Sequence, residues 1–533
     1  MKYPIGIQDF ERIREDGYLY FDKTALIYDL VHSGKVYFLC RPRRFGKSLL
    51  MSTLKCYFEG RKELFRGLAI ERLETEWTPY PVMHLSFGGQ NYNAPDTLEL
   101  VLERFIADAE QLYGKGENAR TYGDRFRAVI ANARKRTGRR AVVLVDEYDK
   151  PLLDVMELED RTTRGGVAMT LEENNRNVLK GFYGVFKEAD PDLQFVMLTG
   201  VTKFSQISVF SGFNQPNDIS MSTQFDTLCG ITDEELSAYL PTETAEMAEA
   251  YHVTVDQMKA MLRKQYDGYH FSRRMKGIYN PFSILRAFDE KFLEDYWFQT
   301  ASPTYLVRLL ADNDEQINEL VGKYYGTEDF VDYRADKERP LPMIYQSGYL
   351  TIKDYDPRLS VYLLDFPNAE VQKGFVTMLA SNYLSRSGVP TPWLREVIMA
   401  FDGGDTARLE ALFTSYFAGI PYPLRGKRVG HEKERHFQYT FFLVLRMIGV
   451  YTTYVEKQQS EGRVDCVVET QRHVYIFEFK RDGSAAEALR QIEEKGYGRE
   501  YLADKRTLHK IGVNFSSRTG TIDGWMSSDG QTV

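Results

Sequence analysis

The sequence predicts an α/β protein that begins with a parallel sheet flanked by helices and ends with a smaller α/β unit. Two patterns support this: short apolar runs alternate with segments whose apolar residues recur at helical spacing, and polar residues directly follow the apolar runs. Strands that alternate with helices form parallel sheets. With 533 residues the chain is too long for one core, so we expect about three or four structural units.

The first part of the chain supplies the strands of the parallel sheet. Residues 1–34 are expected to form an entry segment with short helices. Buried strands are predicted for the apolar runs Val36–Cys40, Pro81–Phe87, Ala141–Val145 and Gln194–Leu198. Helices are predicted for Ser48–Phe58 and Asp96–Tyr113, where apolar residues recur at helical spacing.

From Thr232 the pattern becomes mainly helical to about Leu310. Two strand-like runs, Tyr349–Ile352 and Val361–Leu364, follow and favour a small winged-helix unit. The last unit is expected to open with a long helix from His431 to about Ile448. We then expect strands near 451–456, 463–469 and 473–479, a helix near 484–495 and a strand near 508–515. These patterns place domain boundaries so that the units span residues 1–230, 231–340, 341–425 and 426–533.

Composition predicts a cytoplasmic protein without a membrane segment. Hydrophobic residues make up 43% and charged residues 27% of the chain, ordinary values for a globular protein. No apolar run is long enough to span a bilayer, and the N-terminus lacks the apolar core of a signal peptide. The four cysteines form no CxxC pair and are expected to be buried thiols.

Net charge bears on the choice of partner. The chain carries a net charge of −8, which excludes a general attraction for nucleic acid. Residues 425–481 are nevertheless richer in Lys and Arg than in Asp and Glu. A basic surface there would suit a phosphate backbone, although ordinary surface charge explains the surplus equally well.

A loop between a predicted strand and a predicted helix has the residues of a phosphate-binding loop. Its sequence, Arg41–Ser48, ends in Gly-Lys-Ser. Such a loop curls its backbone N–H groups around phosphate oxygens at a helix N-terminus. Lys47 would reach the β- and γ-phosphates, Ser48 would ligate Mg²⁺, and Gly46 would permit close backbone approach. The first glycine of the general pattern is replaced by Arg41.

Acidic residues at the end of a later strand complete this candidate ATP site. Asp146 would hold Mg²⁺ through water, and Glu147 would polarise the attacking water; alternatively, both merely cap the next turn. Thr199 or Thr202 would sense the γ-phosphate, although polar residues commonly end strands. Arg43 and Arg44 would contact phosphate or a partner, or are solvated. The candidate nucleotide-binding residues are Arg43, Arg44, Phe45, Gly46, Lys47, Ser48, Asp146 and Thr199, with Glu147 as a catalytic residue.

Several of these segments resemble the predicted AAA-ATPase-like family. The matching stretches are Pro4–Phe10, Tyr20–Thr24, Arg41–Ser48, Val145–Lys150, Tyr266–Phe271 and Tyr279–Pro281. In that family the loop commonly reads RPRRFGKS, as it does here. The resemblance covers roughly residues 1–290 and implies a P-loop NTPase core that binds ATP, followed by a helical lid.

Two acids and a lysine near the C-terminus suit a metal-dependent nuclease. Glu478 and Lys480 lie two apart on a predicted strand and therefore face the same side, whereas Phe479 points into the core. Asp465 lies on the neighbouring strand and can meet Glu478. Two carboxylates would hold Mg²⁺, and Lys480 would orient a water or stabilise developing negative charge. The alternative is a solvated strand face with alternating charges.

Two further residues would support this site. Glu434 opens the preceding helix and could add a carboxylate, and Gln491 on the following helix could brace the ligands. The segment also resembles the PD-(D/E)XK nuclease superfamily, which has a restriction-endonuclease-like α/β fold. The matching stretches are Glu434–Gln438, Gly462–Asp465, Tyr475–Lys480, Ala488–Tyr497 and Ile511–Ser516. The resemblance implies catalytic roles for Asp465, Glu478 and Lys480, with Glu434 and Gln491 in support.

Three functions remain open from the sequence. The first is an ATP- and Mg²⁺-dependent nuclease whose ATPase gates or remodels and whose C-terminal domain cuts nucleic acid, with DNA favoured and RNA left open. The second is a switch-type NTPase that forms a homo-oligomer on binding ATP, with the nuclease domain as effector; it rests on architectural analogy. The third is a binding module with an inactive nuclease fold.

Overall fold

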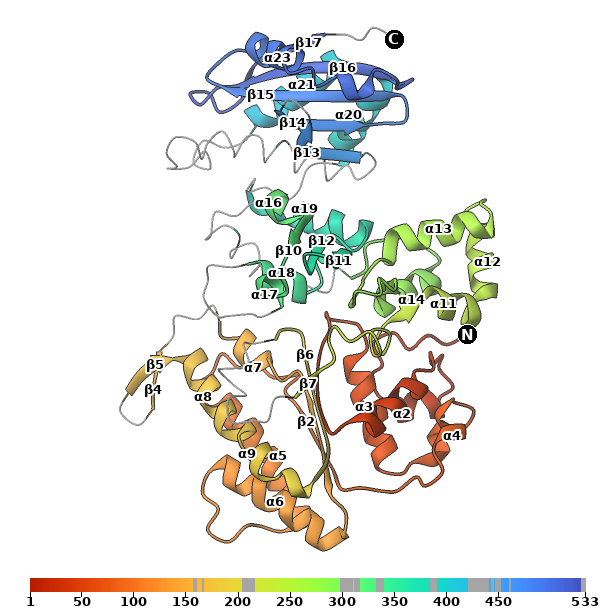
Figure 1. Cartoon of the computed structure of the whole chain (residues 1–533), viewed down its shortest axis with the longest axis vertical. Helices are drawn as coiled ribbons and strands as arrows, with labels where there is room; N and C mark the ends of the chain where they lie inside the picture. The colour runs from red at the N-terminus through yellow and green to blue at the C-terminus, as the bar shows by residue number, and fades with distance from the viewer. Residues whose placement is uncertain are drawn as a thin grey trace. The chain divides into compact units, whose positions relative to one another are not determined.

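The computed structural model of the chain forms two compact units, Met1–Val371 and Gln372–Val533 (Figure 1). It describes residues 1–156, 161–164, 167–203, 216–297, 310, 317–331, 340–383, 391–419, 441, 445, 452–459 and 462–528. The predicted helix over 431–448 therefore lies almost wholly outside the described residues. Within those residues, no helix combines the length and the apolar character needed to cross a membrane.

The first unit is built on a parallel sheet, as predicted. Its strands are β1 (Val36–Cys40), β2 (Val82–Ser86), β3 (Ala141–Asp146), β6 (Leu193–Gly200) and β7 (Asn217–Asp218). The strand order is β2-β3-β6-β1-β7, and every neighbouring pair is parallel. Because parallel strands end at the same edge of a sheet, the segments that follow β1, β3 and β6 lie close together.

Helices cover this sheet because their apolar residues recur every three or four positions. α3 (Lys47–Phe58) and α5 (Thr97–Tyr113) agree with the predicted ranges to within one residue. On α5 the buried side chains of Leu98, Leu102 and Ile106 show this spacing. Two further long helices, α6 (Tyr122–Thr137) and α8 (Leu171–Tyr183), were not singled out from the sequence.

The shorter elements around this sheet complete its domain. They are α1 (Phe10–Glu15), α2 (Thr24–Ser33), η1 (Lys62–Phe65), α4 (Ile70–Leu73), α7 (Lys150–Leu153), β4 (Arg161–Arg164), β5 (Val167–Thr170), α9 (Val185–Glu188) and η2 (Asp190–Asp192). The two short helices α1 and α2 confirm the predicted helical entry segment.

The stretch after Thr232 is helical, as predicted. It contains β8 (Ile231–Thr232), α11 (Asp233–Tyr239), α12 (Pro241–Ala250), α13 (Val255–Tyr266), β9 (Ile278–Tyr279) and α14 (Pro281–Glu290). Side-chain caps define the helix starts: Thr232 forms a capping box with Glu235, and Thr254 forms one with Gln257. These helices share one apolar core that includes Leu262.

A small antiparallel sheet follows in the same unit. β12 (Val361–Asp365) confirms the second predicted strand-like run. β11 (Thr351–Asp356) overlaps the first only at Thr351 and Ile352, and β10 (Lys323–Tyr325) adds a third strand beside β12. The neighbouring helices are α16 (Ile317–Leu320), α17 (Thr327–Phe330), α18 (Leu341–Gln346) and α19 (Ala369–Tyr383). α19 carries the chain from the first unit into the second.

The second unit is a mixed sheet with helices. Its strands are β13 (Thr452–Gln459), β14 (Gly462–Glu469), β15 (His473–Arg481), β16 (Thr507–Phe515) and β17 (Ile522–Ser528), adjacent in that order. Its helices are α20 (Thr391–Gly403), α21 (Thr406–Ala418), α23 (Ala485–Glu494) and the short η5 (Arg499–Tyr501). Only β15 and β16 pair in parallel, because α23 forms the crossover between them.

The sheet of the second unit is buried on both faces. One core lies against α20 and α21 and includes Phe477 and Phe479 of β15. The other core includes Ile476 of β15 and Ile492 of α23. α23 approaches β16 so closely that a Cβ at Gly512 would lie 2.2 Å from the Ala485 carbonyl oxygen. The edge strand β17 was missed because its residues form neither a continuous apolar run nor a strict alternation of polar and apolar types, and most are half-buried.

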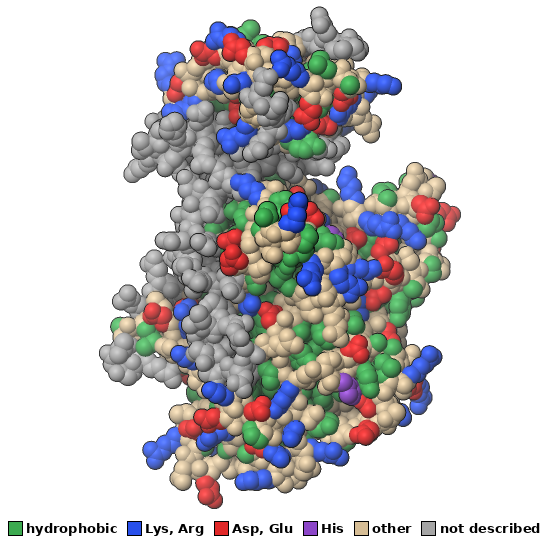
Figure 2. Space-filling view, in the orientation of Figure 1, with side chains coloured by type: hydrophobic (Ala, Val, Ile, Leu, Met, Phe, Trp, Pro, Cys, Tyr) green, Lys and Arg blue, Asp and Glu red, His purple; other side chains and the backbone are tan. Residues whose placement is uncertain are grey.

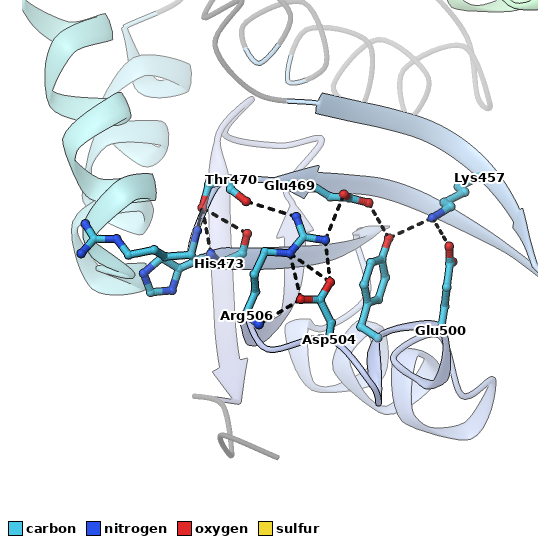
Figure 3. A network of polar contacts seen from close by, with 9 residues as sticks. Lys457, Glu469, Thr470, His473, Glu500, Asp504 and Arg506 are labelled. Carbon is cyan, nitrogen blue, oxygen red and sulfur yellow. Dashed lines mark hydrogen bonds and ion pairs between the residues drawn. The ribbon is translucent and has the colours of Figure 1, made fainter.

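A polar network holds one end of the central strands of this unit (Figure 3). Arg506 donates to Glu469 (3.1 Å), to Asp504 (2.6 Å) and to the Thr470 carbonyl (3.1 Å). The contacts tie the β14–β15 turn to the start of β16. Since β15 runs from His473 to Arg481, the network lies at the opposite end of the strand from Glu478 and Lys480.

Candidate functional sites

The phosphate-binding loop leaves β1 and enters α3 as predicted. Gly46 adopts a left-handed conformation with φ 89° at the start of α3, where a side chain would strain the backbone. Lys47 is only 7% exposed, and its ammonium donates to the carbonyls of Arg41 and Pro42, both at 2.9 Å. Burial lowers the pKa of Lys47. The cation is therefore held inside the curl of the loop, where phosphate oxygens bind in such loops.

Arg41 replaces the first glycine of the general loop pattern and has a structural role. Its side chain is 1% exposed, and its guanidinium donates to the carbonyls of Cys40 (2.8 Å) and Ser220 (2.7 Å). The guanidinium also lies 4.0 Å from the centre of the Phe271 ring, a cation–π contact. Arg41 thus ties the loop to segments that follow β7 and α13.

The predicted acids meet at the ends of β3 and β6. The Thr199 hydroxyl donates to Asp146 Oδ1 at 2.5 Å, so this threonine orients the carboxylate. Glu147 follows with φ 55°, a conformation that costs energy in a non-glycine residue. Burial, followed by the charge of Asp146, raises the pKa of Glu147. Strain at this position favours a functional role over a simple cap.

Sequence reasoning missed Asp149. This buried carboxylate accepts hydrogen bonds from the Val201 amide (2.9 Å), the Thr202 amide (2.6 Å) and the Thr202 hydroxyl (2.8 Å). It therefore locks the turn after β3 to the end of β6, and it engages the hydroxyl that we considered as a γ-phosphate sensor. The only signal in the sequence was an acid three residues after Asp146.

A cavity of about 510 Å³ lies over the loop, within the size range of small-molecule sites. Its lining includes seven predicted residues, Arg43, Arg44, Phe45, Gly46, Lys47, Ser48 and Glu147, and also Asp149. The N-terminal segment and α14 supply apolar walls that include Ile5 and Phe282. Arg44 lies 5.1 Å from the centre of the Phe282 ring. Asp146 and Thr199 are buried and do not line the cavity.

The nuclease-like residues converge where β14 and β15 separate. The regular pairing of these two strands ends at Cys466 and Phe477. Beyond it, the Asp465 carboxylate accepts a hydrogen bond from the Phe479 amide at 2.9 Å. Asp465 and Glu478 thus come together from neighbouring strands, as predicted, and Phe479 is buried in the core.

Gln491 connects the two functional groups of β15. Its amide nitrogen donates to Glu478 Oε1, and its carbonyl oxygen accepts from Lys480 Nζ at 2.6 Å. Lys480 Nζ lies 3.9 Å from Glu478 Oε1. The crossover helix α23 therefore places Gln491 between the acid and the lysine, the bracing position that the sequence suggested.

The second oxygen of Glu478 fits a metal ligand. Glu478 is 2% exposed, and its Oε2 atom is buried without a hydrogen-bond partner among the described residues. A buried unpaired carboxylate oxygen is costly unless something binds it. Mg²⁺ takes one or two protein carboxylates and keeps several waters. Asp465 and Glu478 match that donor set, so the residues present fit Mg²⁺.

Glu434 and Tyr497 are two further residues to consider at this site. Glu434 lies outside the described residues. Tyr497 was missed as a site residue: it is buried, and its hydroxyl donates to the Arg463 carbonyl at 3.0 Å, two residues before Asp465. The sequence placed Tyr497 after Gln491, but only the fold brings it against β14.

The pKa of Glu478 predicts pH-dependent metal binding. Burial, followed by the charge of Asp465, raises this pKa to about 8. Below that pH the carboxyl holds a proton that Mg²⁺ must displace. We expect Mg²⁺ affinity to rise about tenfold per pH unit from roughly pH 6 to 8 and then to level off. Calorimetric titrations across this range test it; a pH-independent affinity would contradict the assignment, and Glu478→Gln should bind weakly at every pH.

Comparison with known proteins places each candidate site within a region that matches a known family. Residues 4–210 match the family described as predicted AAA-ATPase, and residues 432–525 match the PD-(D/E)XK nuclease superfamily. A protein of Azotobacter chroococcum mcd 1, described as "Uncharacterized protein in vnfD 5′region", is 34% identical over 538 residues, covering 98% of each chain. The chain belongs to the predicted AAA-ATPase family with a C-terminal PD-(D/E)XK nuclease domain.

In this predicted AAA-ATPase, each match contains one of the two candidate sites. Lys47, Asp146 and Thr199 lie within the first match, and Asp465 and Glu478 lie within the second. The two domains give the chain ATPase and nuclease potential. A solved structure, the Aeropyrum pernix ORC1 protein in complex with DNA, matches 90% of this chain and 94% of its own with 12% identity and a TM-score of 0.25. A likeness this weak carries no argument.

Proposed function

We propose that this chain is an ATP-binding, Mg²⁺-dependent nuclease that hydrolyses phosphodiester bonds in DNA, with the ATPase module gating or remodelling. One observation carries the nuclease assignment: the buried, unpaired Oε2 atom of Glu478 beside Asp465. A solvated strand face, the alternative considered from the sequence, would not bury this carboxylate. An inactive fold would not need to retain an acid at this cost.

Each residue of the nuclease site has a separate task in this proposal. Asp465 and Glu478 hold Mg²⁺, which when bound supplies an activated water and neutralises charge on the scissile phosphate. Lys480 places its ammonium beside that position to stabilise developing negative charge. Gln491 bonds both the Glu478 and the Lys480 side chain and so holds them in fixed positions relative to each other.

The ATP site is proposed from the phosphate-binding loop, the cavity over it and the acids at the end of β3. Lys47 and Ser48 hold the phosphates and Mg²⁺ at the start of α3. Asp146 is oriented by Thr199 and does not line the cavity, so it would support the metal only through a bridging water. Glu147 lines the cavity and polarises the attacking water. In this proposal the cavity binds ATP, and Glu147 on its lining serves ATP turnover.

Substrate choice relies on charge. The visible face of the molecule shows acidic and basic side chains interspersed (Figure 2), so no general attraction for nucleic acid is expected. DNA is proposed over RNA as the substrate of the C-terminal domain. Either nucleic acid would therefore bind through local contacts around Lys480.

A cleavage assay with metal removal tests the proposed nuclease. We expect the full chain to cut plasmid or oligonucleotide DNA with Mg²⁺, to stop in excess EDTA, and to resume when Mg²⁺ is restored, because Glu478 and Asp465 require a bound cation. Parallel reactions use RNA of the same length, with and without ATP. Cleavage that continues in EDTA would contradict the metal site, and faster cleavage of RNA would correct the substrate.

A further inference from the structure

A buried tryptophan connects the phosphate-binding loop to the helix that leads into the second unit. Trp297 is 1% exposed, and its indole Nε1–H donates to the carbonyl of Arg43 at 3.2 Å. Its ring packs edge-on against Tyr349, with centroids 5.2 Å apart. Its own backbone amide donates to Glu370 Oε1 at 2.7 Å. One residue thus contacts the loop with its side chain and α19 with its backbone.

The contact with Arg43 also bears on the backbone N–H of Arg44, a group of the kind that binds phosphate in such loops. The Arg43 carbonyl and the Arg44 amide belong to one planar trans peptide, so their C=O and N–H bonds point in opposite directions. When Trp297 fixes the carbonyl, it also fixes the direction of the Arg44 N–H. That N–H donates to no group in the described part of the chain, and Arg44 lines the cavity.

The other end of this connection is Glu370, at the start of α19. Glu370 is 1% exposed and lies in the first turn of α19, where the helix dipole favours an acidic side chain. Next to it, Asn368 caps the helix by accepting the Val371 amide at 3.0 Å. A shift of Trp297 must therefore disturb the start of α19.

We propose that Trp297 and Glu370 are positioning residues that set the Arg44 N–H for phosphate and relay occupancy of the loop to α19. The relay rests on the proposed ATP-binding function and names a route for its gating. When a phosphate oxygen accepts a hydrogen bond from the Arg44 N–H, the peptide between Arg43 and Arg44 rotates. The Arg43 carbonyl then moves, Trp297 moves with it, and the hydrogen bond from Trp297 to Glu370 changes. Because α19 runs on to Tyr383, it carries this change into the second unit.

Hydrogen exchange of the full chain with and without Mg²⁺-ATP tests the relay independently of cleavage. We expect ATP to slow exchange of the loop amides and to change exchange at residues 297 and 371–374 by about fivefold, the scale of one buried hydrogen bond. In Trp297→Phe the loop should still respond, whereas residues 371–374 should not. ATP binding should weaken by about fivefold in this variant.

Matched variants separate the relay from general damage. Trp393→Phe removes a similar bond, from Nε1 to the Leu412 carbonyl at 3.2 Å, in the second unit; it should leave ATP affinity and the exchange response at 371–374 unchanged. Glu370→Gln keeps an acceptor for the Trp297 amide and should retain the response, whereas Glu370→Ala should lose it.

The outcomes distinguish the relay from the function on which it rests. A wild-type loop that does not respond to ATP would overturn the proposed ATP site and the relay together. A loop that responds while residues 371–374 do not would overturn the relay alone. An unaltered response at 371–374 in Trp297→Phe would also overturn it.

Discussion

Lys480→Ala is expected to lower Mg²⁺-dependent cleavage by about 10²–10³-fold, the loss seen when one preorganised group that stabilises transition-state charge is removed. The Lys480 ammonium is held 2.6 Å from Gln491 Oε1, beside the two carboxylates. Alanine removes the charge where the phosphate becomes most negative. The side chain is 31% exposed, so the fold should tolerate its loss.

The measurement is the single-turnover rate on DNA at saturating Mg²⁺, which isolates the chemical step. Lys457→Ala is the matched control, because Lys457 lies on β13, two strands away from β15, and its ammonium pairs with Glu500 at 2.7 Å (Figure 3). It should cleave like the wild type. Cleavage by Lys480→Ala within about twofold of the wild-type rate would show that Lys480 has no role in the chemistry.

Lys47→Ala is expected to weaken ATP binding by about 10²-fold, because it deletes a charge-assisted contact with the phosphates. The same change leaves the carbonyls of Arg41 and Pro42 without their donor. We therefore also expect a loss of about 1–3 kcal/mol in the free energy of unfolding. Titration with a slowly hydrolysed ATP analogue, together with thermal unfolding, separates the two effects.

Lys55→Ala, on the solvent side of the same helix, is the control and should change neither quantity. ATP affinity that survives Lys47→Ala would remove the proposed nucleotide site. Light scattering on the same samples addresses the switch-type alternative. If ATP increases the molecular mass of the wild type but not of Lys47→Ala, oligomerisation joins gating as an output of the site.

Local sequence was sufficient for the elements that carry both sites. The apolar run Val36–Cys40 and the Gly-Lys-Ser that follows predicted a strand, a loop and a helix, and β1 and α3 confirm them. The two-residue spacing of Glu478 and Lys480 predicted a common face, and both contact Gln491. Edge strand β17 escaped prediction because its half-buried residues show no continuous apolar run.

The pairings that build the two candidate sites depended on the fold. Asp149 meets Thr202 only because β3 and β6 are neighbours, and Tyr497 reaches the Arg463 carbonyl only because α23 crosses back over the sheet. Trp297 contacts a loop that lies far away in the sequence. No periodicity encodes such contacts.

The sequence by itself therefore determined the two family resemblances and the elements that carry both candidate sites, since strand and helix patterns and short motifs depend on residues a few positions apart. Tertiary structure decided how the groups are tuned. It buried Glu478 beside Asp465 and so raised the carboxyl pKa to about 8. It also linked the loop at Arg43 to Glu370 through Trp297. Burial and the approach of distant charges arise only when the chain packs, because desolvation depends on all the neighbours of a group.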